Sequence, residues 1–238
     1  MALETRHDLL HPPLTEPAAE LPTHGATLLV NELYASIQGE STHAGRPCGF
    51  IRLTGCPLRC VWCDSAFAFQ GGERLEIAEI LRRVADFGLP LVEVTGGEPL
   101  AQPNCLPLLR ALCDAGHEVL LETGGSCDVA PVDPRVGIVL DIKCPGSGES
   151  HANHWENLTR LRPRDELKFV LLDRADYEWA RRLIHQYRLA GTRPIHFSPV
   201  HGALAPAALA AWIIADRLDV RLHLQLHKQI WPGRTHGV

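Results

Sequence analysis

Three cysteines in one short stretch are the residues of this chain best suited to chemistry. Cys56, Cys60 and Cys63 stand at C-x3-C-x2-C spacing, directly after the apolar run 50–54. Thiolate is the soft ligand that zinc and iron–sulfur clusters select. Three thiolates on one loop can hold three irons of a [4Fe–4S] cube and leave the fourth iron open to chelate another molecule. The spacing therefore favours an iron–sulfur cluster with one open coordination site.

Two other uses of these cysteines stay open at this point. A structural zinc site could recruit Cys48 as a fourth ligand, because zinc prefers closed tetrahedral sites. Alternatively, the thiols could be small core residues in a reducing compartment. A zinc-binding or electron-transfer module without catalysis is therefore the rival from another functional class.

The composition is that of an ordinary globular protein and argues against a nucleic-acid partner. The chain has 238 residues, 45% of them hydrophobic and 21% charged, enough for one large α/β domain or two small ones. Its formal net charge of -5 disfavours nucleic acid, which requires a basic patch. The tryptophans are scattered and form no aromatic platform for single strands.

Neither a secretory signal nor a membrane span is expected. The first six residues lack the basic and apolar regions of a signal peptide. The most apolar run, 204–214, is short and contains Pro206. Eight cysteines without a signal indicate reduced thiols and a cytoplasmic protein.

Residues 1–24 differ in composition from the remainder of the chain. They carry Pro12, Pro13, Pro17 and Pro22 among polar residues and alanines, which is typical of a flexible leader. Apolar runs begin at Thr27. We therefore predict a leader over residues 1–24 and a single domain over residues 25–238.

Strand-like and helix-like patterns alternate through that domain. Apolar runs of strand length occupy 28–34, 50–54, 91–95, 119–122, 138–142, 166–171, 195–198 and 221–226. Helical spacing between them places apolar residues on one face, as in Ile77, Ile80, Leu81 and Val84, then Cys105, Leu109, Leu112 and Cys113, then Tyr177, Ala180, Ile184 and Tyr187. This alternation implies right-handed βαβ units and a mostly parallel sheet. Six or seven units are too few for an eightfold barrel, so we predict an α/β fold with an incomplete βα barrel of the TIM type.

Unusual residues gather after the predicted strands, where function collects in parallel α/β folds. The cysteine loop follows 50–54, and Gly96-Gly97-Glu98-Pro99 follows 91–95. Glycines permit a close backbone approach to a ligand, and the Glu98 carboxylate can accept bonds from an ammonium group. Alone, this tetrapeptide is more simply a strand-to-helix turn. Lys168 lies inside an apolar strand, where it needs a partner, and His227 is expected to end the last strand.

The cysteine spacing resembles the signature of the radical S-adenosylmethionine (SAM) superfamily, in which the open iron binds the amino and carboxylate groups of SAM. The flanking residues resemble a narrower group, the 7-carboxy-7-deazaguanine synthase family. The resemblance spans residues 28–232. Its matching pieces are Asn31-Glu32, 36–40, Arg52 ahead of Gly55-Cys56-Pro57, Cys63-Asp64-Ser65, Thr95-Gly96-Gly97-Glu98-Pro99, Asp141-Ile142-Lys143, 145–148, 168–170 and His227-Lys228.

This resemblance implies a radical SAM lyase of deazapurine biosynthesis, on the route to the tRNA base queuosine. Its substrate would be 6-carboxy-5,6,7,8-tetrahydropterin, and its products 7-carboxy-7-deazaguanine and ammonia. A reduced [4Fe–4S] cluster would cleave SAM to a radical that takes a hydrogen from the substrate and returns it after ring contraction. The protein would supply placement and exclude water. A flavodoxin or ferredoxin as reductant, and a homodimer, are implied as well.

The family's functional residues map onto positions of this chain, although no catalytic residue is assigned. The resemblance assigns the cluster to Cys56, Cys60 and Cys63, and Mg2+ to the hydroxyl of Ser65, where threonine is commoner. For SAM it implies Trp62, Cys63, Asp64, Gly97, Glu98, Thr123, Asp141, Ile142, Lys143 and Ser198. For the substrate it implies Ile37, Gln38, Gly39, Glu40, Arg52, Thr95 and His227.

Physical reasons support some of these roles, and two departures from the family pattern stand out. The Arg52 fork suits a carboxylate, and the Gln38 amide suits the edge of a planar pterin. Some members end soon after the His-Lys pair and use the terminal carboxylate on the substrate, whereas this chain continues to Val238. Residues 141–143 stand where some members carry Ser-Pro-Lys. The nearest alternative is another radical SAM enzyme, such as a glycyl-radical-enzyme activase.

Overall fold

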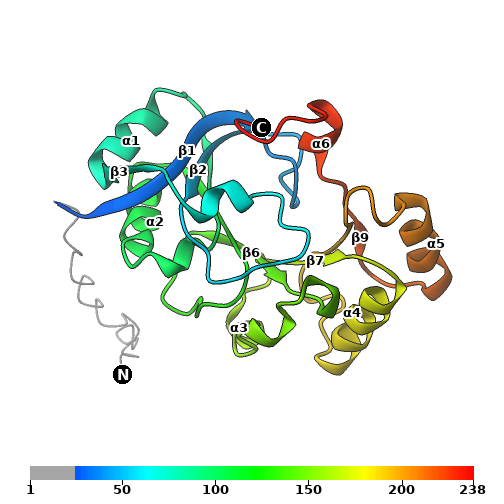
Figure 1. Ribbon diagram of the computed structural model, residues 1–238. Helices are drawn as coiled ribbons and strands as arrows, with labels where there is room; N and C mark the ends of the chain where they lie inside the picture. Colours follow the sequence, from blue (N-terminus) through cyan, green and yellow to red (C-terminus); the bar gives the residue numbers. More distant parts are fainter. Residues whose placement is uncertain (1–24) are drawn as a thin grey trace, which may run out of the picture.

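The computed structural model describes residues 25–238 and is shown in Figure 1. The leader predicted over residues 1–24 lies outside the described residues. Among residues 25–238, no helix combines the length and the apolar character that a membrane crossing requires.

One nine-stranded sheet organises the described chain, in the order β3-β1-β2-β4-β5-β6-β7-β8-β9. Strand β1 (Thr27–Ile37) pairs antiparallel with β2 (Pro47–Leu53) and with β3 (Glu73–Glu76). From β2 onward every pairing is parallel, through β4 (Leu91–Gly96), β5 (Glu118–Thr123), β6 (Gly137–Ile142), β7 (Glu166–Leu171), β8 (Ile195–Pro199) and β9 (Arg221–Leu222). Because β3 and β9 are edges that do not meet, the sheet is open. The predicted incomplete barrel of mostly parallel strands is confirmed.

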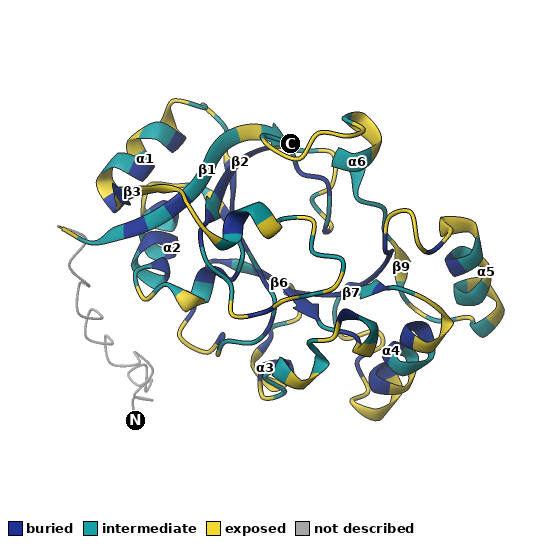
Figure 2. Cartoon of the chain, viewed as in Figure 1, coloured by how far each residue is buried: buried dark blue, intermediate teal, exposed yellow. Residues whose placement is uncertain are grey.

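Helices lie around the outside of the sheet in Figure 1. The longer ones are α1 (Ile77–Ala85), α2 (Cys105–Asp114), α4 (Arg174–Gln186) and α5 (Pro206–Asp216). Two are short, α3 (Asn157–Arg160) and α6 (Leu226–Ile230), and four single 3₁₀ turns are η1 (Ala66–Phe69), η2 (Pro99–Ala101), η3 (Pro145–Ser147) and η4 (Ser150–Ala152). Figure 2 shows buried residues along the strands and exposed residues on the outer sides of α4 and α5.

Two details of the predicted elements were wrong. Helix α4 ends at Gln186, so Tyr187 caps the helix and is 42% exposed instead of facing the core. The predicted strand 221–226 shrinks to Arg221–Leu222. Its alternating pattern imitates a strand, but the backbone N–H of Leu226 donates to the carbonyl of Gly39 and not to β8. His227 consequently lies in α6 and does not end a strand.

Alternation along the strands separates the core from a polar inner face. In β4, Val92 and Val94 belong to the core under the helices, whereas Glu93 and Thr95 line a cavity on the other side. Successive side chains of a strand point to opposite faces, so one strand serves both purposes. The same alternation places three further ionisable side chains on the inner face, Glu122, Asp141 and Lys168.

The core beneath α4 and α5 depends on interlocked aromatic rings, and this generates a stability prediction. Phe197 is fully buried, with ring centroids 5.5 Å from Phe169 and 5.8 Å from Tyr177. Phe197→Ala should lower the free energy of unfolding by about 3–5 kcal/mol in urea titrations, because it leaves a cavity. Ile214→Ala, at a side chain 75% exposed, should change it by less than about 0.5 kcal/mol. Equal effects of the two variants would contradict this account of the core.

Candidate active site

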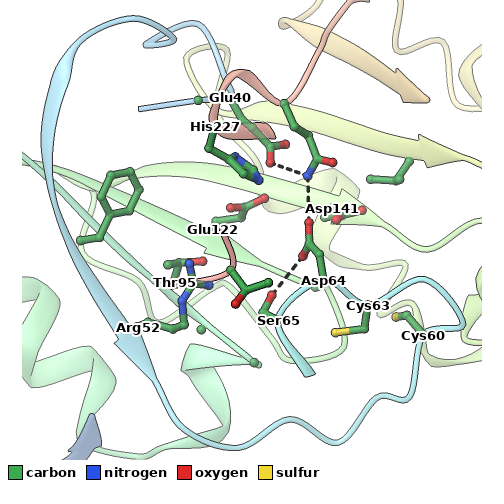
Figure 3. A pocket seen from close by; sticks show the side chains of 18 of the residues that line it. Glu40, Arg52, Cys60, Cys63, Asp64, Ser65, Thr95, Glu122, Asp141 and His227 are labelled. Atoms are coloured by element: carbon green, nitrogen blue, oxygen red, sulfur yellow. Dashed lines mark hydrogen bonds between the residues drawn. The ribbon is translucent and has the colours of Figure 1, made fainter. Parts of the chain in front are cut away.

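A single cavity collects the residues that the sequence singled out. It lies at the carboxyl ends of the parallel strands and has a volume of about 320 Å³, within the range of small-molecule sites. Figure 3 shows Cys60 and Cys63 at one end, Arg52 and Thr95 on another side, and His227 near Glu40. The residues that follow the strands therefore meet around one cavity, as the strand-end rule predicts.

Most of the predicted site residues line this cavity, and three do not. The lining includes Ile37, Gln38, Gly39, Glu40, Arg52, Cys56, Cys60, Trp62, Cys63, Asp64, Ser65, Thr95, Gly97, Thr123, Asp141, Lys143 and His227. Ile142 points into the core under the helices. Ser198 is fully buried, and Val200 and His201 line the cavity beyond it.

Glu98 is the third residue that stands back from the cavity. Its carboxylate accepts the hydroxyl of Thr123 at 2.8 Å and the backbone N–H of Gly124 at 2.9 Å. Burial raises the pKa of Glu98, and these hydrogen bonds oppose the rise. The Glu98 carboxylate, which was predicted to accept hydrogen bonds from an ammonium group, is thus hydrogen-bonded to the end of β5 and the residue after it.

The cysteine loop is arranged in a way that fits an iron–sulfur cluster. Cys56, Cys60 and Cys63 are free, half-buried and on the wall of the same cavity. Among residues 25–238, no three Cys, His, Asp or Glu side chains gather as ligands of a single metal ion. The cysteines of a cube each bind a different iron, so they need not converge on one ion, and three thiols on one cavity wall fit such a cluster.

Cys48 is no ligand for this loop. It is fully buried near the start of β2, packed with Phe50, Leu91 and Leu120. The cysteine loop follows the far end of that strand, about 17 Å away at a strand rise of about 3.3 Å per residue. A zinc site completed by Cys48 is therefore excluded.

A close backbone contact holds the glycine loop against the cysteine loop. A Cβ atom on Gly97 would lie 2.3 Å from the carbonyl oxygen of Gly55 and 2.6 Å from the Cβ of Cys56. Only glycine allows this approach. Gly97 therefore fixes the cysteine loop relative to β4.

Lys168 is a buried ammonium at the centre of the polar inner face. Its Nζ forms ion pairs with Glu40 and, at 2.7 Å, with Glu122, and lies 3.9 Å from Asp141. Burial alone raises the pKa of Glu40, but the charge and hydrogen bond of Lys168, with a bond from Gln225, lower it to about 2. The sequence-based expectation that Lys168 needs partners is confirmed.

Arg52 is held in place by two neighbours on β1, of which Tyr34 also lines the cavity. Its Nε donates to Glu32 at 2.9 Å and its Nη2 to the hydroxyl of Tyr34 at 3.0 Å. Burial raises the pKa of Tyr34 to about 12, so the phenol remains protonated. These two contacts fix the plane of the guanidinium that faces the cavity.

Two ion pairs lie at the end of the cavity nearest the cysteine loop. Asp64 pairs with Lys228 at 2.8 Å, and Asp141 pairs with Lys143 at 3.0 Å. Burial raises the pKa of Asp64, but the charge of Lys228 and its hydrogen bond outweigh burial and lower it. The hydroxyl of Ser65 donates to Asp64 at 3.2 Å, which leaves hard oxygen atoms beside the cluster loop.

The segment beyond α6 returns to the cavity instead of leaving it. Arg234, Thr235 and Val238 line the wall, and the Tyr34 hydroxyl donates to the main-chain oxygen of Val238 at 3.0 Å. The continuation past His227-Lys228 therefore brings additional groups to the site. No sequence pattern in residues 229–238 indicated that this segment would line the cavity.

The chain is similar to named proteins over most of its length. The chain is 48% identical to the 7-carboxy-7-deazaguanine synthase of Chlorobaculum tepidum, over 90% of this chain and 98% of that protein. It is 45% identical to the protein of the same name from Koribacter versatilis, over 88% and 99%. The family model of the radical SAM superfamily matches residues 50–133.

The chain belongs to the 7-carboxy-7-deazaguanine synthase family. It is accordingly a radical SAM enzyme, a class that uses a [4Fe–4S] cluster and SAM. The glycyl-radical-enzyme activase and the non-catalytic zinc or iron–sulfur module are set aside. The crystal structure of QueE from Escherichia coli has a TM-score of 0.71 at 24% identity, over 85% of this chain and 96% of that one, and shows the shared fold.

The sequence analysis did not predict several of the residues that line the cavity. Glu93 and Glu122 were never proposed as ligands, although strand alternation from Thr95 marks Glu93 as facing the same way. Gln225, which donates to Glu40 at 3.0 Å and Asp64 at 3.2 Å, lay in the region mistaken for a strand. Periodicity could have found the first two, but not the third.

The buried charge of Lys168 generates a second stability prediction. Lys168→Met leaves Glu40 and Glu122 buried without their cation, which should lower the free energy of unfolding at pH 7 by about 3–5 kcal/mol. The lowered pKa of Glu40 means that its stabilisation is present above its ordinary value of 4.5 and is lost as pH falls toward about 2. The gap between variant and wild type should therefore narrow between pH 4.5 and about 2.

Urea titrations at pH 7 and pH 3.5 measure this gap. Arg82→Met, at a helix side chain 63% exposed, is the control and should shift stability by less than about 1 kcal/mol at either pH. A gap that does not change with pH would show that Lys168 acts through packing alone.

Proposed function

We propose that the protein converts 6-carboxy-5,6,7,8-tetrahydropterin to 7-carboxy-7-deazaguanine and ammonia, in the pathway to queuosine or a related deazapurine. The observation that carries this proposal is one cavity in which the three loop cysteines share a wall with Gln38, Arg52 and Thr95. The reaction rearranges the atoms of one molecule and releases ammonia without net oxidation.

Cys56, Cys60 and Cys63 would hold the cluster. Trp62, Cys63, Asp64, Gly97, Thr123, Asp141 and Lys143 would surround SAM. When bound, the cluster and SAM supply the radical that starts the ring contraction. Glu98 would act by positioning Thr123 and Gly124, and Val200 and His201 would take the place predicted for Ser198. Ile142 would act only as part of the core.

The substrate end of the cavity has groups of the required chemistry. Arg52 would bind the substrate carboxylate, held for that task by Glu32 and Tyr34. Thr95 and the backbone of Ile37 and Gly39 would contact the ring. His227 would cover it, since His227 Nδ1 lies 3.1 Å from where a Cβ on Gly39 would be.

Further elements of the proposal rest on chemistry alone. Ser65 beside Asp64 would hold Mg2+ together with the substrate carboxylate. A flavodoxin or ferredoxin would approach at the cluster loop, where Val61 is 75% exposed. We further propose that the protein is cytoplasmic and that residues 25–238 form one domain. We also propose that it is a homodimer, which light scattering tests.

Anaerobic turnover of carboxytetrahydropterin with SAM and dithionite tests the proposed activity. Arg52→Ala should lower kcat/KM about 10- to 100-fold, mainly through KM, because a charged hydrogen-bond partner of the substrate is lost. Arg74→Ala, at an exposed arginine of β3, should leave kcat/KM within about twofold. Loss of the cluster absorbance in Arg52→Ala would make that residue structural, and no product from wild type would end the proposal.

Ser65 provides a separate test of the magnesium site. Ser65→Ala should abolish the activation of turnover by added Mg2+, whereas Ser65→Thr should keep it, because only the hydroxyl oxygen is required. Rates are compared at rising MgCl2 concentration, with the cluster spectrum as the control for loop integrity. Equal magnesium activation in all three proteins would place the ion elsewhere.

A further inference from the structure

The amide of Gln38 is engaged by the protein at both ends. Its Oε1 accepts the backbone N–H of Glu40 at 2.6 Å, and its Nε2 donates to Oε2 of Glu93. Gln38 is only 3% exposed. The amide that the sequence assigned to the pterin edge therefore holds another side chain, Glu93, in a fixed orientation.

Strand register places Glu93 deeper in the cavity than the carboxylate-binding end. Arg52 of β2 pairs with Thr95 of β4, and Phe50 pairs with Glu93. Glu93 is two residues before Thr95 on the same face, which corresponds to about 7 Å along the strand. A bicyclic ring whose carboxylate lies at Arg52 would extend along β4 toward Glu93.

The surroundings of Glu93 hold more carboxylates than cations. Lys168 is paired with Glu40 and Glu122, and Arg52 is paired with Glu32. The remaining ionisable groups that face Glu93 are the thiol of Cys48 and the phenol of Tyr34. No cation among residues 25–238 forms an ion pair with Glu93, and Lys168 and Arg52 act on it only from a distance while paired with other carboxylates.

Burial reinforces this shortage of positive charge. Glu93 is 3% exposed, and burial, followed by the negative charges of Glu122 and Glu40, raises its pKa well above the ordinary value, against the weaker opposing effect of Lys168 and Arg52. Like charges at close range keep one carboxyl protonated. A protonated carboxyl can donate one hydrogen bond and accept others, whereas a carboxylate can only accept.

We propose that Glu93 binds the substrate as a neutral carboxylic acid. Its O–H donates to the carbonyl oxygen of the lactam edge of the pterin. Its other oxygen, which accepts the amide N–H of Gln38, also accepts the adjacent ring N–H. The inference rests on the proposed function, because the pterin is the molecule that offers this edge. No proton moves between the partners, so the contact selects the ring and positions it for the chemistry.

An ionised Glu93 would recognise a different edge. It would accept two N–H groups from the ring nitrogen and the exocyclic amine, and glutamine could not replace it. A neutral acid and a glutamine amide both present one donor and one acceptor. The two substitutions Glu93→Gln and Glu93→Leu therefore separate the two states.

The test measures binding of 6-carboxypterin, a stable analogue, by isothermal titration to the anaerobic holoenzyme with SAM at pH 6.0–7.5. Glu93→Leu should raise the Kd at least 30-fold, and Glu93→Gln should recover most of the affinity, to within about fivefold of wild type. Glu76→Gln, at an exposed residue, should bind as wild type does. Where Glu93→Leu does not fold, Glu93→Ala serves the same comparison.

Each outcome decides the proposal. A loss in Glu93→Gln as large as in Glu93→Leu would overturn it in favour of an ionised carboxylate. Wild-type affinity in Glu93→Leu would overturn it by showing no contact. Turnover by wild type tests the proposed function separately, since these titrations require no product.

Discussion

Lys168 carries its charge into a region where water hardly reaches, and much of the architecture is arranged around it. A lone buried ammonium would be strongly destabilising. Glu40 from the loop after β1 and Glu122 from β5 compensate it, with Asp141 nearby. Because these partners come from separate parts of an open sheet, the ion pairs connect segments that backbone pairing leaves apart. Removing the cation thus affects both the stability of the fold and the shape of the cavity.

The sheet also separates two requirements that usually conflict. A core needs close apolar packing, whereas this site needs ionisable groups held without much water. Strand alternation satisfies both, since Val92 and Val94 pack under the helices while Glu93 and Thr95 face inward. Loops at the strand ends then add the three cysteines that we propose as cluster ligands. The close approach of Gly97 to Gly55 keeps the cysteine loop beside the end of β4, so the cysteines and Thr95 face the same cavity.

Sequence patterns were sufficient for the elements whose partners are local. The bounds of β4 to β8 lie within a residue of those that periodicity predicts, and the strand-end rule brought their neighbouring residues together with the cysteine loop. Patterns failed where a distant segment decided the outcome. His227 was expected to end the last strand, but the backbone N–H of Leu226 donates to the carbonyl of Gly39 and the chain continues into α6. Glu98 was assigned to a ligand, but Thr123 and Gly124 occupy its carboxylate. No local pattern encodes such partners.

The residues of the segment Gln38-Gly39-Glu40 each have a structural partner within the protein, so a motif can lie at a site without every residue contacting a ligand. Gln38 holds Glu93 on β4, Gly39 accepts from Leu226 before α6, and Glu40 pairs with Lys168 on β7. Each residue joins this loop to a different wall of the cavity. A larger residue at Gly39 would meet His227 at 3.1 Å, and a shorter side chain at either flank would miss its partner. These positions therefore need their residue types to connect the walls of the cavity, whether or not they also contact the proposed substrate.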